Sequence, residues 1–318
     1  MVTVNSVLGP IDTDKLGFTL MHEHLMVSSA GIPQDYDRLF GDDYMERIVQ
    51  GLKKAKAGGI DTVVDATTLD LGRDVTIMAE ASRRSGVNIV AVTGWWLEFP
   101  RHFLGVSADQ FADLFTREIE EGIAGTGIKA GLLKAASDIS GVTPVEDRVL
   151  RGVARAHRRT GVPIMLHSYS QGQVGRQQIA VLREEGVDLR HVKLDHSNDT
   201  TDVEYLTWIL EQGCYLGLDR YPGQITSSRA RTRTMKALID AGWAHRLLPS
   251  HDHALVWLKL EGLPNNPPPS AEQKEMRNVH GYLYMKNVVF AQLKEMGIPE
   301  AILNYLCVDG PKNFFESK

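Results

Sequence analysis

Cysteine is scarce in this chain of 318 residues, with only Cys214 and Cys307 present. Two cysteines are too few for a disulfide framework, and they lack the paired spacing of a zinc ribbon or a redox motif, so we expect both to be small core residues. A surplus of charge of one sign is also missing, because 35 basic residues are interspersed with 40 acidic ones for a formal net charge of −5. This balance argues against a nucleic-acid partner and favours a small-molecule substrate.

Long apolar runs are absent as well. The longest, residues 87–97, includes Asn88 and is well short of the roughly 18 apolar residues that span a bilayer. Near the N-terminus, Pro10 and the charged residues Asp12, Asp14 and Lys15 stand where a signal peptide needs an unbroken apolar stretch. The sequence therefore predicts a cytoplasmic protein with no membrane partner.

Short β-branched runs alternate with amphipathic stretches along almost the whole chain, which is typical of βα units around a parallel sheet. At about 150 residues per domain the length suggests two domains, but one α/β barrel routinely takes about 250 residues. Strands are expected at residues 19–25, 62–66, 88–93, 129–135, 163–167, 191–196, 215–219 and 247–252, and helices at 74–84, 108–122, 146–159, 202–211 and 229–241. Because no linker divides the chain, we expect one (β/α)8 TIM barrel domain over residues 1–318.

Helix ends fit this pattern. Ser107 is placed to cap the helix that begins at residue 108, and Gly161 and Gly186 follow helical stretches, where a left-handed residue is expected. One break in composition follows the last strand, since residues 262–270 include four prolines, which regular structure does not accommodate. In a barrel this segment would be the eighth βα loop, either a lid over the substrate pocket or a passive surface crossover.

The strongest local motif lies in the first expected strand. His22 and His24, two residues apart, project to the same side of a strand and can bind one metal ion, whereas Glu23 points to the other side. On this spacing alone, an incidental pair of buried histidines remains the alternative.

Three further residues with suitable donor atoms fall at the ends of expected strands: His167, His196 and Asp252. Because the strand ends of a barrel converge on one mouth, these residues should meet His22 and His24 there. Four imidazoles and a carboxylate suit two ions of Zn²⁺ or a similar transition metal.

Lys134 ends the fourth expected strand. An ammonium group cannot bind a metal, but an amine with a depressed pKa can react with carbon dioxide to give a carbamate, whose two oxygens can bridge two ions. The commoner alternative for a buried lysine is an ion pair with a carboxylate.

Several longer motifs, in their order along the chain, resemble those of the phosphotriesterase family of the amidohydrolase superfamily; they lie at residues 17–24, 65–74, 131–134, 195–200, 217–220 and 250–252. The resemblance implies a barrel with a binuclear centre at its C-terminal face. His22, His24 and Asp252 would hold the more buried ion, His167 and His196 the more exposed one, and carboxylated Lys134 would bridge them with a hydroxide. Zinc is the expected metal, with cobalt, manganese or iron as alternatives, and the family suggests a homodimer.

Two acidic residues are expected to handle the proton of the attacking hydroxide. Asp252 is placed to accept it during attack. Asp199, three residues after His196, would either accept it next or orient the surroundings of Asp252; the alternative for Asp199 is a loop residue that caps the helix at residue 202. Arg220 completes the expected catalytic residues.

Substrate preference is the least determined feature, because two positions indicate different members of the family. Arg220 stands where its lactonases have arginine, but Trp96 stands where they have tyrosine, and an indole cannot supply a phenolic hydroxyl. Trp96, Leu71, Tyr221 and Trp257 are expected to line the pocket, although packing within loops is the alternative for Tyr221 and Trp257.

The predicted function is a binuclear metal-dependent hydrolase of lactones with promiscuous phosphotriesterase activity. If the protein is an enzyme, the alternative is a dedicated phosphotriesterase or another carboxylic or phosphoric ester hydrolase. If it is not, the alternative is a non-catalytic metal-binding protein.

Arg229, Arg231 and Arg233 form a basic cluster in the sequence. These residues would either bind an anionic substrate or lie at the solvated start of a helix.

Overall fold

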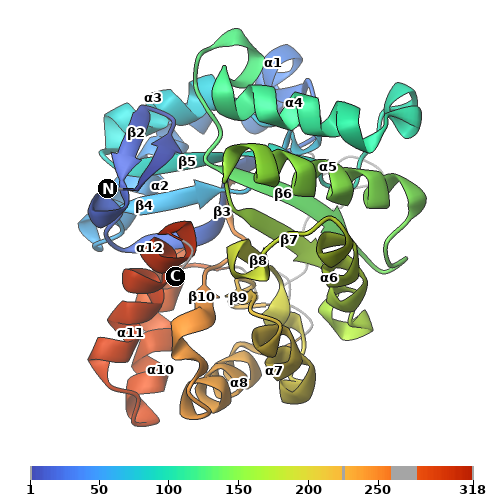
Figure 1. Cartoon of the computed structure of the whole chain (residues 1–318). Helices are drawn as coiled ribbons and strands as arrows, with labels where there is room; N and C mark the ends of the chain where they lie inside the picture. The colour runs from blue at the N-terminus through green and yellow to red at the C-terminus, as the bar shows by residue number, and fades with distance from the viewer. Residues whose placement is uncertain (1, 224–225, 259–277, 317–318) are drawn as a thin grey trace, which may run out of the picture.

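A parallel nine-stranded sheet forms the centre of the computed structural model, which describes residues 2–223, 226–258 and 278–316 (Figure 1). Neighbouring strands follow the order β10-β9-β8-β7-β6-β5-β4-β3-β11. Their bounds are β3 Thr19–Val27, β4 Thr62–Asp65, β5 Asn88–Gly94, β6 Leu132–Ser137, β7 Ile164–Ser168, β8 Val192–Leu194, β9 Tyr215–Leu218, β10 Leu247–Pro249 and β11 Ala254–Trp257.

The eighth expected strand is divided into β10 and β11, and this division closes the barrel. β10 pairs with β9, whereas β11 pairs with β3 at the other edge of the sheet. Between them, the Asp252 N–H donates to the carbonyl of His22 at 3.1 Å, and the His24 N–H donates to the carbonyl of His253 at 3.0 Å. One continuous segment thus joins both edges of the sheet, and the predicted α/β barrel is confirmed.

Helices surround the sheet, as Figure 1 shows. The five expected helices are confirmed to within two residues at each end, as α3 Val75–Ser85, α4 Ala108–Glu120, α5 Pro144–Thr160, α7 Val203–Glu211 and α8 Ser228–Asp240. The sequence patterns did not predict the hairpin β1 Thr3–Ser6 and β2 Gly9–Asp12, nor the helices α1 Ile32–Asp35, α2 Tyr44–Ala57, α6 Gly175–Glu184, α10 Phe290–Glu295, α11 Glu300–Cys307 and α12 Asp309–Glu316. The proline-rich segment 262–270, interpreted as a lid or a crossover, lies outside the described residues.

The expected helix ends are built as predicted. Ser107 accepts from the Gln110 N–H, and the Gln110 side chain accepts from the Ser107 N–H, which forms a capping box at the start of α4. Gly161 ends α5 with φ 74°, and Gly186, with the same φ, follows α6. These short-range rules therefore locate the start of α4 and the ends of α5 and α6.

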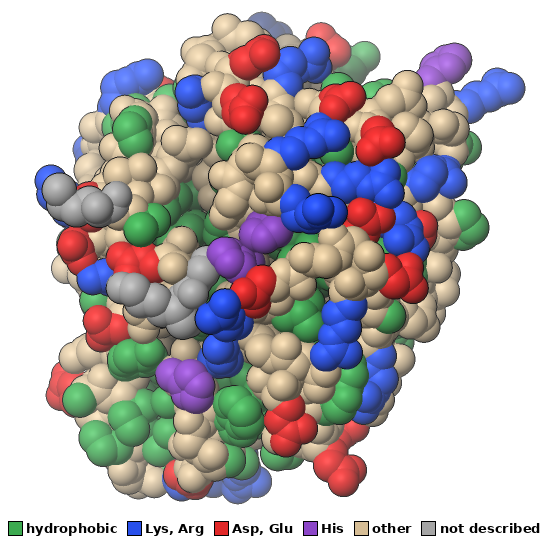
Figure 2. Space-filling model, viewed as in Figure 1, with side chains coloured by type: hydrophobic (Ala, Val, Ile, Leu, Met, Phe, Trp, Pro, Cys, Tyr) green, Lys and Arg blue, Asp and Glu red, His purple; other side chains and the backbone are tan. Residues whose placement is uncertain are grey.

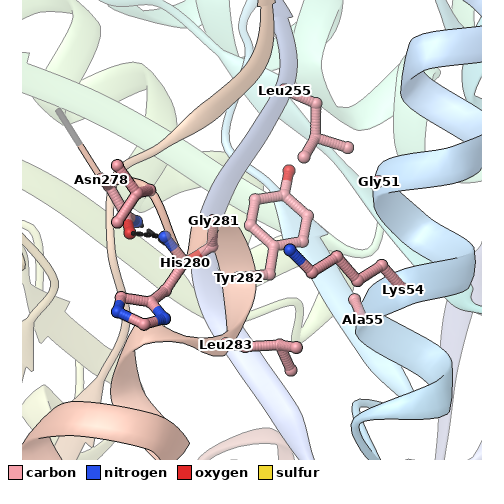
Figure 3. Close-up of a pocket in the computed structure, with 10 residues that line it drawn as sticks. Gly51, Lys54, Ala55, Leu255, Asn278, His280, Gly281, Tyr282 and Leu283 are labelled. Atoms are coloured by element: carbon pink, nitrogen blue, oxygen red, sulfur yellow. Dashed lines mark hydrogen bonds between the residues drawn. The ribbon is translucent and has the colours of Figure 1, made fainter.

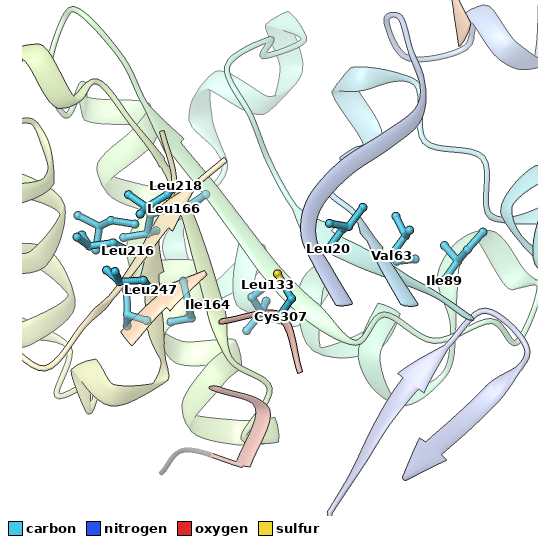
Figure 4. Packing of buried hydrophobic residues seen from close by; sticks show 14 of the residues in the cluster. Leu20, Val63, Ile89, Leu133, Ile164, Leu166, Leu216, Leu218, Leu247 and Cys307 are labelled. Carbon is cyan, nitrogen blue, oxygen red and sulfur yellow. The ribbon is translucent and has the colours of Figure 1, made fainter. Parts of the chain in front are cut away.

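Two layers of apolar side chains form the core. One layer lies between the strands and the helices and includes Leu20, Val63, Ile89 and Leu216, shown in Figure 4. The second is a smaller cluster that includes Met21, Val64, Val90, Leu132 and Met165, which fills the inside of the barrel. Alternation along parallel strands that are buried on both faces explains the two layers. Cys214 and Cys307 are free and buried, as predicted.

Charged side chains of both signs are interspersed over the face shown in Figure 2. Some of them form ion pairs between neighbouring helices: Arg155 of α5 pairs with Asp109 of α4 at 2.9 Å and with Glu185, which follows α6, at 2.8 Å. None of the helices in the described part of the chain has the length and apolar character needed to cross a membrane.

Gly94, at the end of β5, offers a test of the barrel's packing. Its φ is +123°, and a Cβ atom there would lie 1.8 Å from the Lys134 carbonyl oxygen. We expect Gly94→Ala to lower the free energy of unfolding by at least about 3 kcal/mol, because the cost of the strained backbone and the cost of the steric overlap are added together. Gly86→Ala is the matched control, since its φ is +72° but no atom lies within 4 Å of the added Cβ, so only strain applies. Denaturant unfolding measures both, and equal losses would contradict the close approach.

Candidate metal centre

The six expected metal ligands all lie at the C-terminal mouth of the barrel. His22 and His24 belong to β3, Lys134 to β6 and His167 to β7, while His196 follows β8 and Asp252 joins β10 to β11. All are buried except the Asp252 side chain, which is 19% exposed.

Asp252 lies between the two histidines of β3. Its Oδ1 atom is 3.2 Å from His24 Nε2 and 3.4 Å from His22 Nε2. Donor atoms of His22, His196 and Asp252 all lie within 4.8 Å of one another, which is close enough for one ion to contact all three. The tertiary structure thus brings together residues that are up to 230 positions apart.

His167 and His196 form the other half of the cluster. Their Nδ1 and Nε2 atoms, respectively, are 2.8 Å apart. His167 is flanked by Asp138, whose Oδ2 lies 3.3 Å from Nε2, and by Trp96, whose indole N–H is directed at Nδ1 at 3.3 Å. Asp138 follows β6 and was not predicted to belong to the site.

The Lys134 side chain lies inside the barrel, where Nζ donates to the carbonyl of Ala66 at 2.7 Å. Burial lowers the pKa of Lys134, and the carboxylates of Asp252, Asp195 and Asp70 oppose that shift without reversing it. A buried lysine with a lowered pKa has more of the neutral amine that reacts with carbon dioxide.

Two further carboxylates, Asp195 and Asp219, lie beneath His22. Their Oδ2 atoms are 3.1 and 3.3 Å from His22 Nδ1. Asp219 Oδ1 also accepts from the His196 N–H at 2.9 Å and lies 2.9 Å from His196 Nδ1. Sequence reasoning assigned neither aspartate a role, although each lies at the C-terminal end of an expected strand, and that position was the available signal.

The charge around His22 fits a bound cation. Burial lowers the pKa of His22, but Asp195, Asp252 and Asp219 outweigh it and raise that pKa to about 10. Burial also raises the pKa of Asp252, yet the neighbouring His22 and His24 hold it well below the usual range. In the protein alone a proton on His22 balances these carboxylates, and a divalent ion can take over that task.

The remaining histidines are suited to act as neutral ligands. Burial lowers the pKa of His24, His167 and His196, so their imidazoles keep a free lone pair near neutral pH. Neutral imidazole nitrogens and ionised carboxylates are the donors that zinc and similar ions prefer, so the residues present fit such a metal.

Arg220 links the two expected proton acceptors. Its Nε donates to Asp252 at 2.9 Å and its Nη1 donates to Asp199 at 2.7 Å. Asp199 is buried and also accepts from Arg231 at 2.7 Å. The alternative of a helix cap is wrong for Asp199, because Asp202 itself caps α7 by accepting from the Tyr205 N–H.

The expected basic cluster is divided by the structure. Arg229 and Arg233 are exposed, whereas Arg231 is buried and donates to the carbonyl oxygens of Asn198 and Thr226 as well as to Asp199. Arg231 is therefore not a solvated residue at the start of a helix. It is also not free to bind an anionic substrate, because loop carbonyls and Asp199 already accept from its guanidinium group.

Glu23 holds the segment that carries Asp252. Its carboxylate accepts from the Ser250 hydroxyl at 2.7 Å and from the backbone N–H groups of His251 and His253 at 3.0 and 3.2 Å. Asp252 itself has φ +51°, which a residue other than glycine rarely adopts. Glu23 does point away from the ligand pair, as expected, but it is fully buried and stabilises this strained turn.

The four expected substrate contacts differ widely in exposure. Trp96 is half-buried, with its ring edge-on to His167 at 5.9 Å, and Trp257 is 56% exposed at the end of β11. Leu71 and Tyr221 are buried, and Tyr221 packs in the core. Of these four, Trp96 has a direct contact with an expected metal ligand.

Two cavities lie away from the ligands. One of about 220 Å³ lies between α2 and the chain near Tyr282, and Figure 3 shows Lys54 and Leu255 beside it. Another of about 450 Å³ is lined by the loops after β3, β4 and β5, with Asp70, Trp95 and Phe103 on its wall. Neither is lined by any of the six expected ligands.

The fold and these donor atoms define a (β/α)8 barrel with a cluster suited to metal ions at its C-terminal mouth. The chain matches the phosphotriesterase family over residues 2–315. It belongs to that family and is therefore a hydrolase.

Relatives in three groups of organisms support this assignment. A phosphotriesterase homology protein of Mycobacterium tuberculosis is 39% identical, over 99% of this chain and 98% of its own length. An aryldialkylphosphatase of Saccharolobus solfataricus is 34% identical, over 96% of both chains. An N-acetyltaurine hydrolase of Rattus norvegicus is 25% identical, over 99% of this chain and 98% of its own.

Proposed function

We propose that this protein is a binuclear metal-dependent hydrolase that acts on lactones, with phosphotriesterase activity as a side reaction. The observation that carries the proposal is Arg220, which donates to Asp252 beside the histidine cluster. The arginine corresponds to the lactonase pattern of the family, and the similarity to an aryldialkylphosphatase supports the triesterase side reaction.

His22, His24 and Asp252 would hold one ion, His167 and His196 the other, and carboxylated Lys134 would bridge them. Two such ions, zinc being the expected metal, would supply a Lewis acid for the attacked carbonyl or phosphoryl oxygen and lower the pKa of a bound water. Attack on a lactone and on a phosphotriester develops similar negative charge, so one set of groups can serve both.

Asp252 would accept the proton of the attacking water. Its carboxylate stays ionised because His22, His24 and Arg220 surround it. Arg220 lies between Asp252 and Asp199 and cannot release its own proton, so Asp199 would orient Arg220, and through it Asp252, rather than receive the proton directly. Trp96 would offer an apolar face for the substrate next to His167.

Metal content is the first test of this centre. We expect the purified protein to bind about two ions per chain after incubation with Zn²⁺ or Co²⁺, because the six residues make two coordination sets. Elemental analysis after removal of free metal gives the ratio. A protein that retains no metal would contradict the proposed centre.

A hydrolysis screen tests the substrate class. The metal-loaded protein is assayed on lactones, phosphotriesters, simple carboxylic esters and phosphate esters, with an N-acyl amide included because relatives are named N-acetyltaurine hydrolases. We expect the highest kcat/KM on a lactone. A preference for triesters would indicate a dedicated phosphotriesterase, and activity on none of them would leave a metal-binding protein.

We also expect a homodimer in the cytoplasm, which light scattering and cell fractionation can test. Neither expectation alters the proposed chemistry at the barrel mouth, where the small-molecule substrate would bind.

A further inference from the structure

A second buried lysine lies beneath the metal centre. Lys193 belongs to β8, and none of its surface is exposed. Its Nζ atom donates to the carbonyl of Met21 at 3.2 Å and forms an ion pair with Oδ1 of Asp195. A charged side chain so deeply buried requires a partner, and Asp195 is that partner.

The other oxygen of Asp195 continues this chain of contacts to a metal ligand. Asp195 Oδ2 lies 3.1 Å from His22 Nδ1, while Nε2 on the far side of the same ring faces Asp252. Lys193 lies in β8 and Asp195 directly follows it, two residues further along the chain. A continuous polar path therefore runs from Lys193 through Asp195 to His22.

The space around Asp195 shows why a cation is required there. Asp195 and Asp219 both approach His22 Nδ1, and a Cβ atom on Gly217 would lie 2.4 Å from Asp195 and 2.5 Å from Asp219. Two carboxylates this close and this buried repel each other. The positive charge of Lys193 offsets the negative charge of Asp195 on the side of the carboxylate that faces away from His22.

We propose that Lys193 is a positioning residue for His22 and acts through Asp195. The ion pair holds the Asp195 side chain in place with Oδ2 facing Nδ1, which orients the imidazole so that Nε2 faces the metal site. Partners of this kind orient metal-bound histidines in many proteins. The inference rests on the metal centre of the proposed function and does not depend on which substrate is hydrolysed.

The test separates orientation of His22 from stability of the core. Lys193→Met leaves Asp195 buried without its partner, so we expect a lower Tm and weaker metal binding. Lys193→Met/Asp195→Leu replaces the pair by apolar side chains of similar shape, which often restores stability. We expect its Tm to recover while its affinity for Zn²⁺, measured by chelator competition, stays about 10- to 100-fold below that of the wild type.

Arg73 and Glu118 supply a matched control. They form a two-point ion pair with distances of 2.7 and 2.8 Å, in which Arg73 is buried and Glu118 is half-buried, and which contacts none of the six proposed ligands. Arg73→Met/Glu118→Leu should leave Zn²⁺ affinity unchanged. Should the Lys193 double variant not fold, Asp195→Asn, which keeps the shape and removes the charge, is expected to weaken Zn²⁺ binding about tenfold.

The outcomes are distinct. Wild-type Zn²⁺ affinity in the folded Lys193 double variant, or in Asp195→Asn, would overturn this inference alone. A wild-type protein that binds metal but hydrolyses no substrate would overturn the proposed activity and leave this inference standing. A wild-type protein that binds no metal would overturn both.

Discussion

Replacing Asp252 by asparagine is expected to reduce kcat on a lactone by about 10² to 10⁴, the usual contribution of a general base. The amide oxygen of asparagine can still coordinate an ion weakly, but it cannot accept a proton. Since Asp252 lies within 3.4 Å of both His22 and His24, metal content should fall only modestly. Steady-state kinetics and elemental analysis on the same preparation separate the two proposed roles of Asp252, metal ligand and proton acceptor.

Asp202→Asn is the control for this substitution. Asp202 is another carboxylate near the mouth, but it caps α7, and asparagine caps a helix equally well. Its kcat should equal that of the wild type. If Asp252→Asn kept both its metal and a near wild-type kcat, Asp252 would be a ligand only, and its proposed role as proton acceptor would be wrong.

The second large effect is expected from Lys134→Ala. Loss of a residue that only orients a metal ligand usually lowers metal affinity or activity 10- to 100-fold, so loss of the proposed bridging ligand itself should reduce activity by at least about 100-fold. The space left by the side chain can admit a small carboxylate. Short carboxylic acids, supplied with carbon dioxide, should therefore restore part of the activity, which a purely structural lysine would not allow.

Lys286→Ala is the matched control, because Lys286 also donates to backbone carbonyls, those of Gly58 and Gly59, but lies away from the mouth. It should keep its activity with or without added acid. Full activity in Lys134→Ala would rule out the carbamate. NMR of the wild type with isotopically labelled carbon dioxide offers a direct measurement, since a carbamate carbon resonates apart from free bicarbonate.

The expected ligands could be predicted because of where they fall along the chain. His167 ends an apolar run and His196 ends a segment in which apolar residues alternate with charged ones, and strand ends of a barrel meet at one mouth whatever the details of packing. The same argument applied to Asp195 and Asp219, which occupy equivalent positions. Their role was missed because an aspartate at a strand end does not reveal from sequence whether it faces a metal or another ligand.

Helices α2 and α6 illustrate a second kind of omission. Each lies in a βα connection where a barrel requires a helix, yet neither was among the expected helices. α6 starts at Gly175, and no side-chain hydrogen bond caps the start of either helix, so the local start signals are weak. Packing against the strands stabilises both helices more than their intrinsic preference does.

The sequence by itself determined the order of strands along the chain, the capped helix ends and the proposed donor residues at the barrel mouth, because these depend on periodicity and on short-range hydrogen bonds. Only the tertiary structure decided the contacts between distant segments: Arg220 between Asp252 and Asp199, the burial of Arg231, and Asp195 against His22. Charged side chains look alike along a sequence whether water or another charge surrounds them. Closure of the barrel excludes the water, and each buried charge then requires a partner within the protein.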